Sequence, residues 1–280
     1  MKYNEILRKY ENLARQEKKE TSAIKMLLLH ASNLETSVLY ASLNTEMEES
    51  KFNHFEEMVN KYLYNNIPVQ HLIGYDYFYG YKFVVNENVL IPRFETEELV
   101  QNVLMYYDEV FEGEKVDVVD IGTGSGAIAI SLALEEPNMN VLATDISKEA
   151  LETAIINNEN NGGKVKFLHG DMLEPLKGMK FDILVSNPPY IPSEEYVEPL
   201  VKDNEPHVAL FGGIDGLYFY RIILSGAREL LKDKFIIAFE HAYNTGEQIV
   251  ELAKEKFPDC EVILLKDMQQ KNRMTFILKR

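Results

Sequence analysis

From Val116 onward, short apolar segments alternate with helical patterns, and this alternation limits the chain to few folds. The predicted strands are Val116 to Asp120, Val141 to Asp145, Val165 to Leu168, Phe181 to Ser186, Phe235 to Glu240, Glu261 to Leu265 and Met274 to Leu278. Helices are expected from Ser125, from Ser147, over Leu217 to Leu231 and over Gly246 to Lys256. The pattern predicts an α/β fold with a mainly parallel, doubly wound sheet and right-handed crossovers.

The preceding part of the chain lacks this alternation. Apolar residues recur at helical spacing four times within residues 1–73, and Thr21-Ser22 and Thr36-Ser37 are predicted N-caps. The aromatic stretch Tyr75 to Ile91, with turn signals, predicts a β-hairpin. We therefore expect a helical recognition or structural domain at 1–73, a β-hairpin connector at 74–92 and the α/β domain at 93–280.

Composition excludes several protein classes. A single cysteine, Cys260, excludes a disulfide framework, and the six histidines show no metal-ligand spacing with it, so no metal is expected. The start of the chain lacks a signal-peptide core and no apolar run is long enough to span a membrane. We expect a cytoplasmic protein without membrane contact, and a monomer, because both domains account for their apolar faces.

Charge is distributed unevenly along the chain. The net charge is −16, yet residues 1–72 hold nine basic and ten acidic side chains, whereas the remainder holds 20 and 35. An acidic catalytic region repels a phosphate backbone, so nucleic acid is disfavoured as a direct substrate and a basic protein partner is favoured. Acidity that only maintains solubility is an equally good explanation of this feature alone.

The tetrapeptide Asn187-Pro188-Pro189-Tyr190 directly follows the predicted buried strand Phe181 to Ser186. Neither proline has an N–H, and Pro188 holds Asn187 extended, so the loop offers carbonyl acceptors without competing backbone donors. The Asn187 side-chain carbonyl and a neighbouring backbone carbonyl can accept both hydrogens of a planar –NH2 group, and Tyr190 offers it a flat face. A pair of prolines that merely ends a strand is the alternative.

A glycine-rich turn follows the first strand of the α/β domain. Gly122-Thr123-Gly124-Ser125-Gly126 lets a ligand approach the backbone beside a helix N-terminus, and Asp145 follows where an acidic residue binds a ribose. These residues do not distinguish a nicotinamide dinucleotide from S-adenosylmethionine. Asp171 and Met172, after the third strand, suit the edge and face of an adenine, although Asp171 can instead cap a turn. Because hydride transfer has no use for two acceptors around a nitrogen, methyl transfer fits better.

Residues before and after these motifs are further candidates. Arg93 and Glu95 either point into a site at the strand ends or are solvated at the surface, and a helix is expected to start near Thr96 as N-cap. The stretch Ile191 to Gly216 is long for a loop in such a fold, as is typical of a lid or a binding surface.

At these residues the sequence resembles the HemK/PrmC-type protein glutamine N5-methyltransferases. The resemblance is carried by Pro68 to Gly74, Phe78 to Gly80, Val89 to Glu97, Asp120 to Ala129, Ser186 to Ile191, Glu205-Pro206, Ala209 to Leu217 and Tyr220-Arg221. It implies a helical N-terminal substrate-recognition domain, a hairpin connector and a class I, Rossmann-like methyltransferase domain. It also implies that S-adenosylmethionine is the cofactor, S-adenosylhomocysteine the product, and class I peptide chain release factors, modified at the glutamine of Gly-Gly-Gln, the protein substrate.

The resemblance also implies roles for individual residues. Cofactor contacts are implied at Gly122 to Gly126, Asp145, Met172 and Asn187, to which the strand-end pattern adds Asp171. Substrate contacts are implied at Asn187, Pro188, Pro189 and Tyr190. Two residues depart from the family pattern: Phe94 replaces the usual proline after Arg93, and Met172 stands where a larger side chain such as tryptophan can occur.

The expected reaction is direct in-line displacement, with the amide nitrogen oriented by the carbonyl groups of Asn187 and Pro188 and without a general base. Tyr190 is the third predicted catalytic residue. Three alternatives remain. The same tetrapeptide suits an adenine N6-methyltransferase acting on DNA or RNA after base flipping. A nicotinamide-dependent oxidoreductase and a non-catalytic sensor of an adenosyl ligand are the other two.

Overall fold

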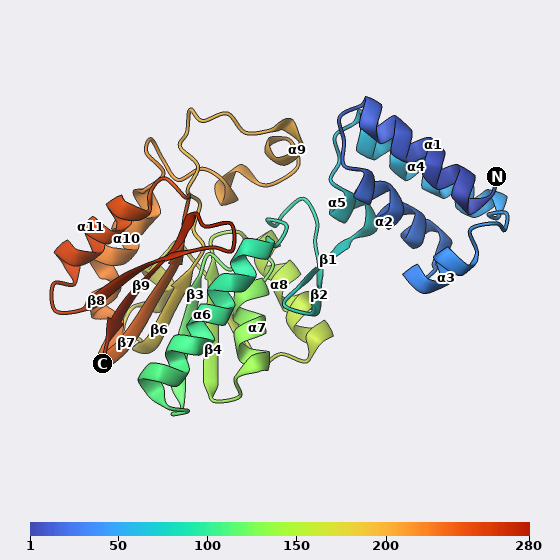
Figure 1. The fold of residues 1–280 in the computed structure, drawn as a ribbon. Coiled ribbons are helices and arrows are strands. Elements are labelled where there is room, and N and C mark those ends of the chain that lie inside the picture. Colours follow the sequence, from blue (N-terminus) through green and yellow to red (C-terminus); the bar gives the residue numbers. More distant parts are fainter. The chain divides into compact units, whose positions relative to one another are not determined.

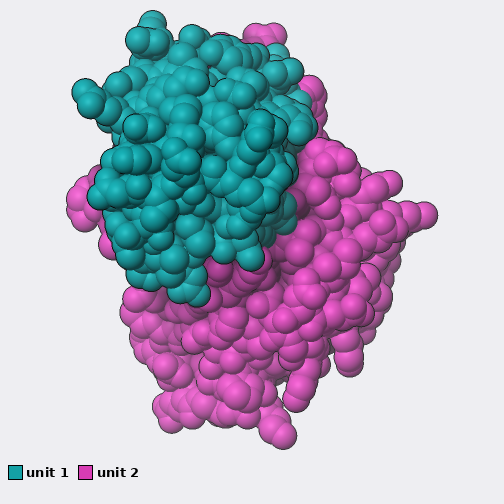
Figure 2. All heavy atoms as spheres, turned by 90° about the vertical axis from the view of Figure 1, so that its right-hand side faces the viewer, with its two compact units in different colours: residues 1–75, 197–204 teal, residues 76–196, 205–280 magenta.

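The computed structural model describes residues 1–280, which form two compact units. Unit 1 comprises residues 1–75 and 197–204, and unit 2 comprises residues 76–196 and 205–280, coloured separately in Figure 2. Nearly all of the predicted connector 74–92 therefore falls within unit 2. Residues 197–204, from the long stretch after the Asn-Pro-Pro-Tyr tetrapeptide, belong to unit 1.

Unit 1 is helical, as its apolar spacing predicts. Its helices are α1 (Tyr3–Gln16), α2 (Thr21–Ser32), α3 (Thr36–Ala41), α4 (Glu49–Tyr64), α5 (Val69–Ile73) and the short α9 (Pro199–Lys202). The apolar faces of α1 to α5 share one core. The predicted N-caps are wrong by one residue: the chain is still extended at Glu20 and Glu35, which are the caps, so the Thr21 and Thr36 hydroxyls lie inside the first turns.

Unit 2 contains the predicted α/β sheet, visible in Figure 1. Its strands are β3 (Val116–Ile121), β4 (Met139–Asp145), β5 (Lys166–His169), β6 (Phe181–Ser186), β7 (Leu231–Glu240), β8 (Glu261–Lys266) and β9 (Asn272–Lys279). They lie in the order β5-β4-β3-β6-β7-β9-β8, and β9 alone runs in the direction opposite to the other strands. The predicted fold class is confirmed. A hairpin of β1 (Tyr75–Phe78) and β2 (Tyr81–Val84) precedes this sheet.

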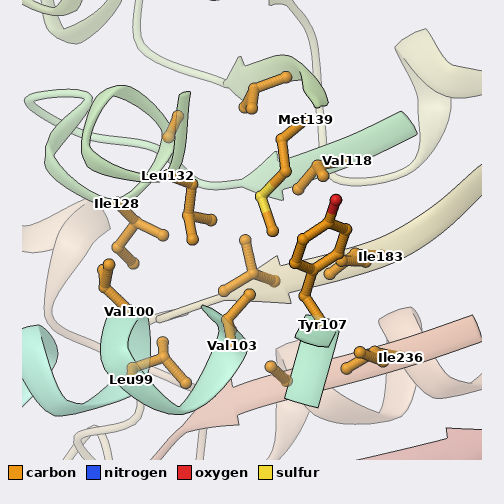
Figure 3. Close-up of a cluster of buried hydrophobic side chains, with 14 of the residues drawn as sticks. Leu99, Val100, Val103, Tyr107, Val118, Ile128, Leu132, Met139, Ile183 and Ile236 are labelled. Carbon is orange, nitrogen blue, oxygen red and sulfur yellow. The ribbon is translucent and has the colours of Figure 1, made fainter. Parts of the chain in front are cut away.

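Helices cover both faces of the sheet because successive strand residues point to opposite sides. The helices of unit 2 are α6 (Phe94–Phe111), α7 (Ala127–Glu135), α8 (Lys148–Asn161), α10 (Tyr218–Gly226) and α11 (Gly246–Lys256), with 3-10 turns at Glu174–Leu176, His207–Ala209 and Ala227–Glu229. Val118, Ile183 and Ile236 belong to one core, with residues of α6 and α7, as Figure 3 shows. The next residue along each of these three strands belongs to the core on the opposite face, with residues of α10 and α11.

Several predicted element boundaries are wrong; the helix expected from Ser125, for example, begins at Ala127. The helix expected over Leu217 to Leu231 ends at Gly226, because Leu231 already pairs with Phe181 at the start of β7. Helix α6 begins at Phe94 with Arg93 as its N-cap, which places Thr96 in the first turn. Proline is favoured at the first helical position, where Phe94 stands, because its missing N–H needs no partner there. None of the helices is long and apolar enough to cross a membrane.

Candidate functional site

A cavity lies within unit 2 at the carboxyl ends of the parallel strands. The strand order reverses between β3 and β6, and such a switch point leaves a crevice for ligands. The space includes about 1050 Å3 free of protein atoms, part of it open to solvent. Predicted site residues on its wall are Arg93, Thr96, Gly122 to Ser125, Asp145, Asp171, Met172, Asn187 and Pro189.

The glycines of the turn after β3 have two different functions. Gly122 and Gly124 have φ angles of +75° and +55°, and a Cβ added to either would meet no atom within 4 Å. Both therefore leave room for a ligand at the backbone. Gly126 ends the turn, and its added Cβ would lie 2.7 Å from Ile130 Cδ1 and 3.2 Å from Ala154 Cβ. Gly126 thus permits close packing of α7 and α8.

Asp145, at the end of β4, supports this turn while it lines the cavity. Its Oδ2 accepts a hydrogen bond from the Gly124 N–H at 2.8 Å, and its Oδ1 accepts one from the Ser147 N–H at 2.9 Å. Burial raises the pKa of Asp145, and these backbone hydrogen bonds oppose the rise. The carboxylate is thereby fixed next to the open space at Gly124.

Asp171 and Met172 follow β5 and lie on the cavity wall. Asp171 is exposed, and its backbone carbonyl accepts a hydrogen bond from Glu174 N–H at 2.9 Å, so a turn does follow it. Met172 has a φ angle of +45°, which is rare for a residue other than glycine, asparagine or aspartate. Backbone strain of this kind concentrates at ligand sites.

The predicted acceptor loop follows β6, but its four residues are not equivalent. Asn187 and Pro189 line the cavity, whereas Pro188 is buried. Tyr190 packs against the core under α10 and α11, and burial raises its pKa to about 12. The structure therefore places Asn187 at the cavity and packs Tyr190 against the core.

A second glycine loop fixes the backbone of this acceptor loop. Ile191 N–H donates to Leu210 O at 3.0 Å, and Gly212 N–H donates to Ile191 O at 2.8 Å. A Cβ added at Gly212 would overlap the Pro189 carbonyl oxygen, and one at Gly216 would overlap that of Tyr190. Only glycine permits both contacts, so Gly212 and Gly216 set the position of the Pro189 and Tyr190 carbonyls.

Arg93 connects the N-terminus of α6 to the long stretch after β6. It lines the cavity and forms an ion pair with Glu205, whose side chain is 1% exposed. Glu205 also accepts a hydrogen bond from Ile91 N–H at 3.3 Å, and burial raises its pKa while Arg93 opposes the rise. Thr96 lies buried on the cavity wall. Glu95 does not line the cavity; it accepts a hydrogen bond from Gln269 Nε2 at 3.3 Å.

Two buried carboxyl groups were not among the residues selected from the sequence. Asp120, at the end of β3, is 0% exposed; its Oδ2 accepts a hydrogen bond from Thr123 Oγ1 at 2.6 Å, while its Oδ1 has no partner. Glu240, the last residue of β7, is 2% exposed, and its Oε2 has no partner. Burial raises the pKa of each group to about 7. An acidic residue at the end of an apolar strand was the available signal, since Asn187 was found directly after the last residue of β6.

Comparisons with known proteins agree with this arrangement. Residues 98–206 match the family "Methyltransferase small domain", and residues 5–74 match "PrmC N-terminal domain". The chain is 41% identical to "Release factor glutamine methyltransferase" of Bacillus cereus over 280 residues, 99% of each chain. It is 44% identical to the protein of the same name from Bacillus subtilis over 260 residues, which is 91% of this chain and 90% of that one.

Solved structures share the fold at low sequence identity. A methyltransferase from Pyrococcus furiosus, 20% identical, superposes with a TM-score of 0.51 over 72% of this chain and 90% of that one. The Thermus thermophilus 16S rRNA N2 G1207 methyltransferase in complex with AdoMet and guanosine, 19% identical, gives 0.50 over 74% of this chain and 50% of that one. At these identities the comparison concerns the fold alone.

Proposed function

The chain belongs to the family of release factor glutamine methyltransferases, and on this premise we propose that it methylates the side-chain nitrogen (N5) of the Gly-Gly-Gln glutamine in class I peptide chain release factors. One observation carries the proposal: Asn187, which can accept from an amide –NH2, lines the same cavity as the open glycine turn after β3. The enzyme is proposed to act as a monomer in the cytoplasm, where release factors work.

The cavity fits S-adenosylmethionine as the second substrate. This cofactor, when bound, supplies a methyl group on a positively charged sulfur and leaves as S-adenosylhomocysteine. Gly122 and Gly124 leave free space for a ligand against their backbone, and Asp145 presents a fixed carboxylate beside it. Asp171 and Met172 form the wall at β5, where an adenine edge and face would lie. The whole set of proposed cofactor contacts is Gly122, Thr123, Gly124, Ser125, Gly126, Asp145, Asp171, Met172 and Asn187.

The acceptor loop overcomes the weak nucleophilicity of an amide. The lone pair of the glutamine nitrogen is delocalised into its own carbonyl group, so it attacks a methyl group poorly. The proposed acceptors are Asn187 Oδ1, at the cavity, and the backbone carbonyl of the buried Pro188, which would orient the –NH2 group and stabilise the positive charge that grows on nitrogen. Methyl transfer would form a bond from nitrogen to the methyl carbon in place of the carbon–sulfur bond of the cofactor, and the proton lost from nitrogen would pass to water. Pro189 and Tyr190 hold the loop in place.

Label transfer tests the proposal. The protein is incubated with methyl-labelled S-adenosylmethionine and, separately, with a purified class I release factor, the same factor with Gln→Ala in Gly-Gly-Gln, duplex DNA and single-stranded DNA. We expect label on the intact factor alone. Label on DNA alone would support adenine N6-methylation instead, because the same loop can hold that exocyclic amine. Light scattering of the 32.3 kDa chain tests whether it is a monomer.

A further inference from the structure

Glu240 lies next to the acceptor loop, and the reaction described above gives it no role. It ends β7, the neighbour of β6 in the sheet, and Phe239 pairs with Ser186, the residue before Asn187. Hydrogen bonding by the side chains of Thr96 and Asn187 opposes the rise that burial causes in the pKa of the Glu240 carboxyl group. Asn187 Nδ2 also donates to Thr96 Oγ1 at 3.3 Å. Three residues from α6, β7 and the acceptor loop therefore form one network.

The direction of the hydrogen bonds in this network depends on the carboxylate. An asparagine amide can present either its oxygen or its –NH2, and only its partners decide which end faces which way. An ionised carboxylate accepts hydrogen bonds and donates none. Next to ionised Glu240, Asn187 must therefore turn its Nδ2 toward the carboxylate. Thr96 accepts from Asn187 and donates its own hydroxyl hydrogen to Glu240.

We propose that Glu240 is a positioning residue, which holds Asn187 with its Oδ1 turned toward the acceptor amide of the substrate. This inference rests on the proposed function. In the opposite orientation Asn187 would present –NH2 to the substrate –NH2, two donors would meet, and the nucleophile would be turned away. Glu240 does not touch the substrate; it acts through Asn187.

The position of Glu240 is unfavourable for stability, which supports a functional reason for it. The residue is 2% exposed and its Oε2 has no hydrogen-bond partner, and buried polar atoms of this kind are destabilising. Burial raises its pKa to about 7, a rise that Thr96, Arg273 and Asn187 oppose and Glu95 strengthens. The other ionisable groups near it are Tyr190, Tyr220 and the adjacent His241. Their pKa values lie far from neutrality, at about 12 for Tyr190 and about 4 for His241 and well above 10 for Tyr220.

The test compares Glu240→Gln with a matched control. Glutamine keeps the shape but offers an –NH2 as well as an oxygen, so Asn187 is free to turn over. We expect kcat at saturating cofactor and release factor to fall about tenfold or more, with KM and the Kd for S-adenosylmethionine within about twofold. Asp182→Asn is the control: this buried carboxyl lies at the other end of β6, accepts from Asp117 N–H at 2.7 Å and pairs with Lys232. It should lower the Tm but leave kcat unchanged.

The pH profile provides a readout that a merely structural residue would not affect. Wild-type kcat should rise with pH through about 7 as Glu240 ionises, and Glu240→Gln should lose that rise. Asp120, the other group with a pKa near 7, is present in both proteins and controls for effects at the glycine turn.

Three outcomes decide the inference. A lower kcat with the pH-dependent rise abolished supports it. Wild-type kcat and pH profile in Glu240→Gln, or an equal loss of kcat in Asp182→Asn, would overturn it while leaving the proposed function intact. If the wild-type enzyme itself transfers no methyl group to a release factor, the proposed function fails first. Should Glu240→Gln not fold, Thr96→Val removes the hydroxyl link from the other side, and a kcat equal to wild type would then refute the network.

Discussion

Gly216→Ala tests whether the second glycine loop sets the position of the acceptor loop. The added Cβ would overlap the Tyr190 carbonyl oxygen and lie 3.2 Å from its carbonyl carbon. Restoring an ordinary contact requires the Tyr190 backbone to shift by about 1 Å, and a misplacement of that size costs on the order of 10²-fold in rate. We expect kcat for methyl transfer to the release factor to fall about 10²-fold, with the cofactor Kd nearly unchanged because Gly216 does not line the cavity.

Gly113→Ala separates this effect from backbone strain. Gly113 and Gly216 have φ angles of +82° and +74°, so alanine is strained at both, but a Cβ at Gly113 would meet no atom within 4 Å. Both variants should lose about 1 kcal/mol of stability from the left-handed conformation, and Gly216→Ala should lose more from the overlap. Steady-state kinetics and thermal unfolding of the two proteins make the comparison. A folded Gly216→Ala enzyme with wild-type kcat would refute the idea that this contact positions the loop.

Four further outcomes are expected. Asn187→Ala and Asn187→Asp should each lower kcat by roughly 10²–10³, measured by label transfer; near-normal turnover would exclude the proposed role. Gly124→Ala fills space beside Asp145 and should raise the S-adenosylmethionine Kd about tenfold in calorimetry, more than it lowers kcat. Arg93→Ala leaves Glu205 buried without its cation and should destabilise the protein by about 1–3 kcal/mol in denaturant unfolding, toward the lower figure because Arg93 is partly solvated. Burial raises the pKa of Glu240, so its ionisation is disfavoured only in the folded state. As the pH rises from about 4.5 to 7, the free energy of unfolding of the wild type should therefore fall by up to about 3 kcal/mol relative to that of Glu240→Gln; the same difference between the two proteins at pH 5 and pH 8 would contradict this.

Local sequence patterns predicted most of the α/β unit because its elements are short and end at clear signals. Strand Phe181–Ser186 and helix Gly246–Lys256 have their predicted bounds. Ser147 caps α8, and its side chain accepts from Ala150 N–H. The helix predicted to reach Leu231 instead stops at Gly226, because pairing of Leu231 with Phe181 extends β7 toward it. Helical spacing contains no information about that long-range strand pairing.

The candidate site was predictable to the same extent. Motifs that lie within one loop, such as Gly122 to Gly126 and Asn187 to Tyr190, are visible as spacing, and the structure places Gly122, Gly124 and Asn187 at one cavity. Glu240 has no local motif. Its partners Thr96 and Asn187 come from distant parts of the chain, and only the sheet order places β7 beside β6.

Glu240 also shows why activity and stability favour different pH ranges in this site. Its folded-state pKa lies near 7, above the ordinary value, so folding is most favourable when the group is protonated. Only the ionised form fixes the orientation of Asn187, because a carboxylate accepts hydrogen bonds and cannot donate one back, whereas a protonated carboxyl group can do either. Arg273, Thr96 and Asn187 lower the pKa enough for ionisation near neutral pH, yet Oε2 remains without a partner. If Glu240 served stability alone, glutamine or an apolar residue of similar volume would be the better occupant of the position. A carboxylate kept there at a cost to folding is therefore best explained by its effect on the neighbouring acceptor loop.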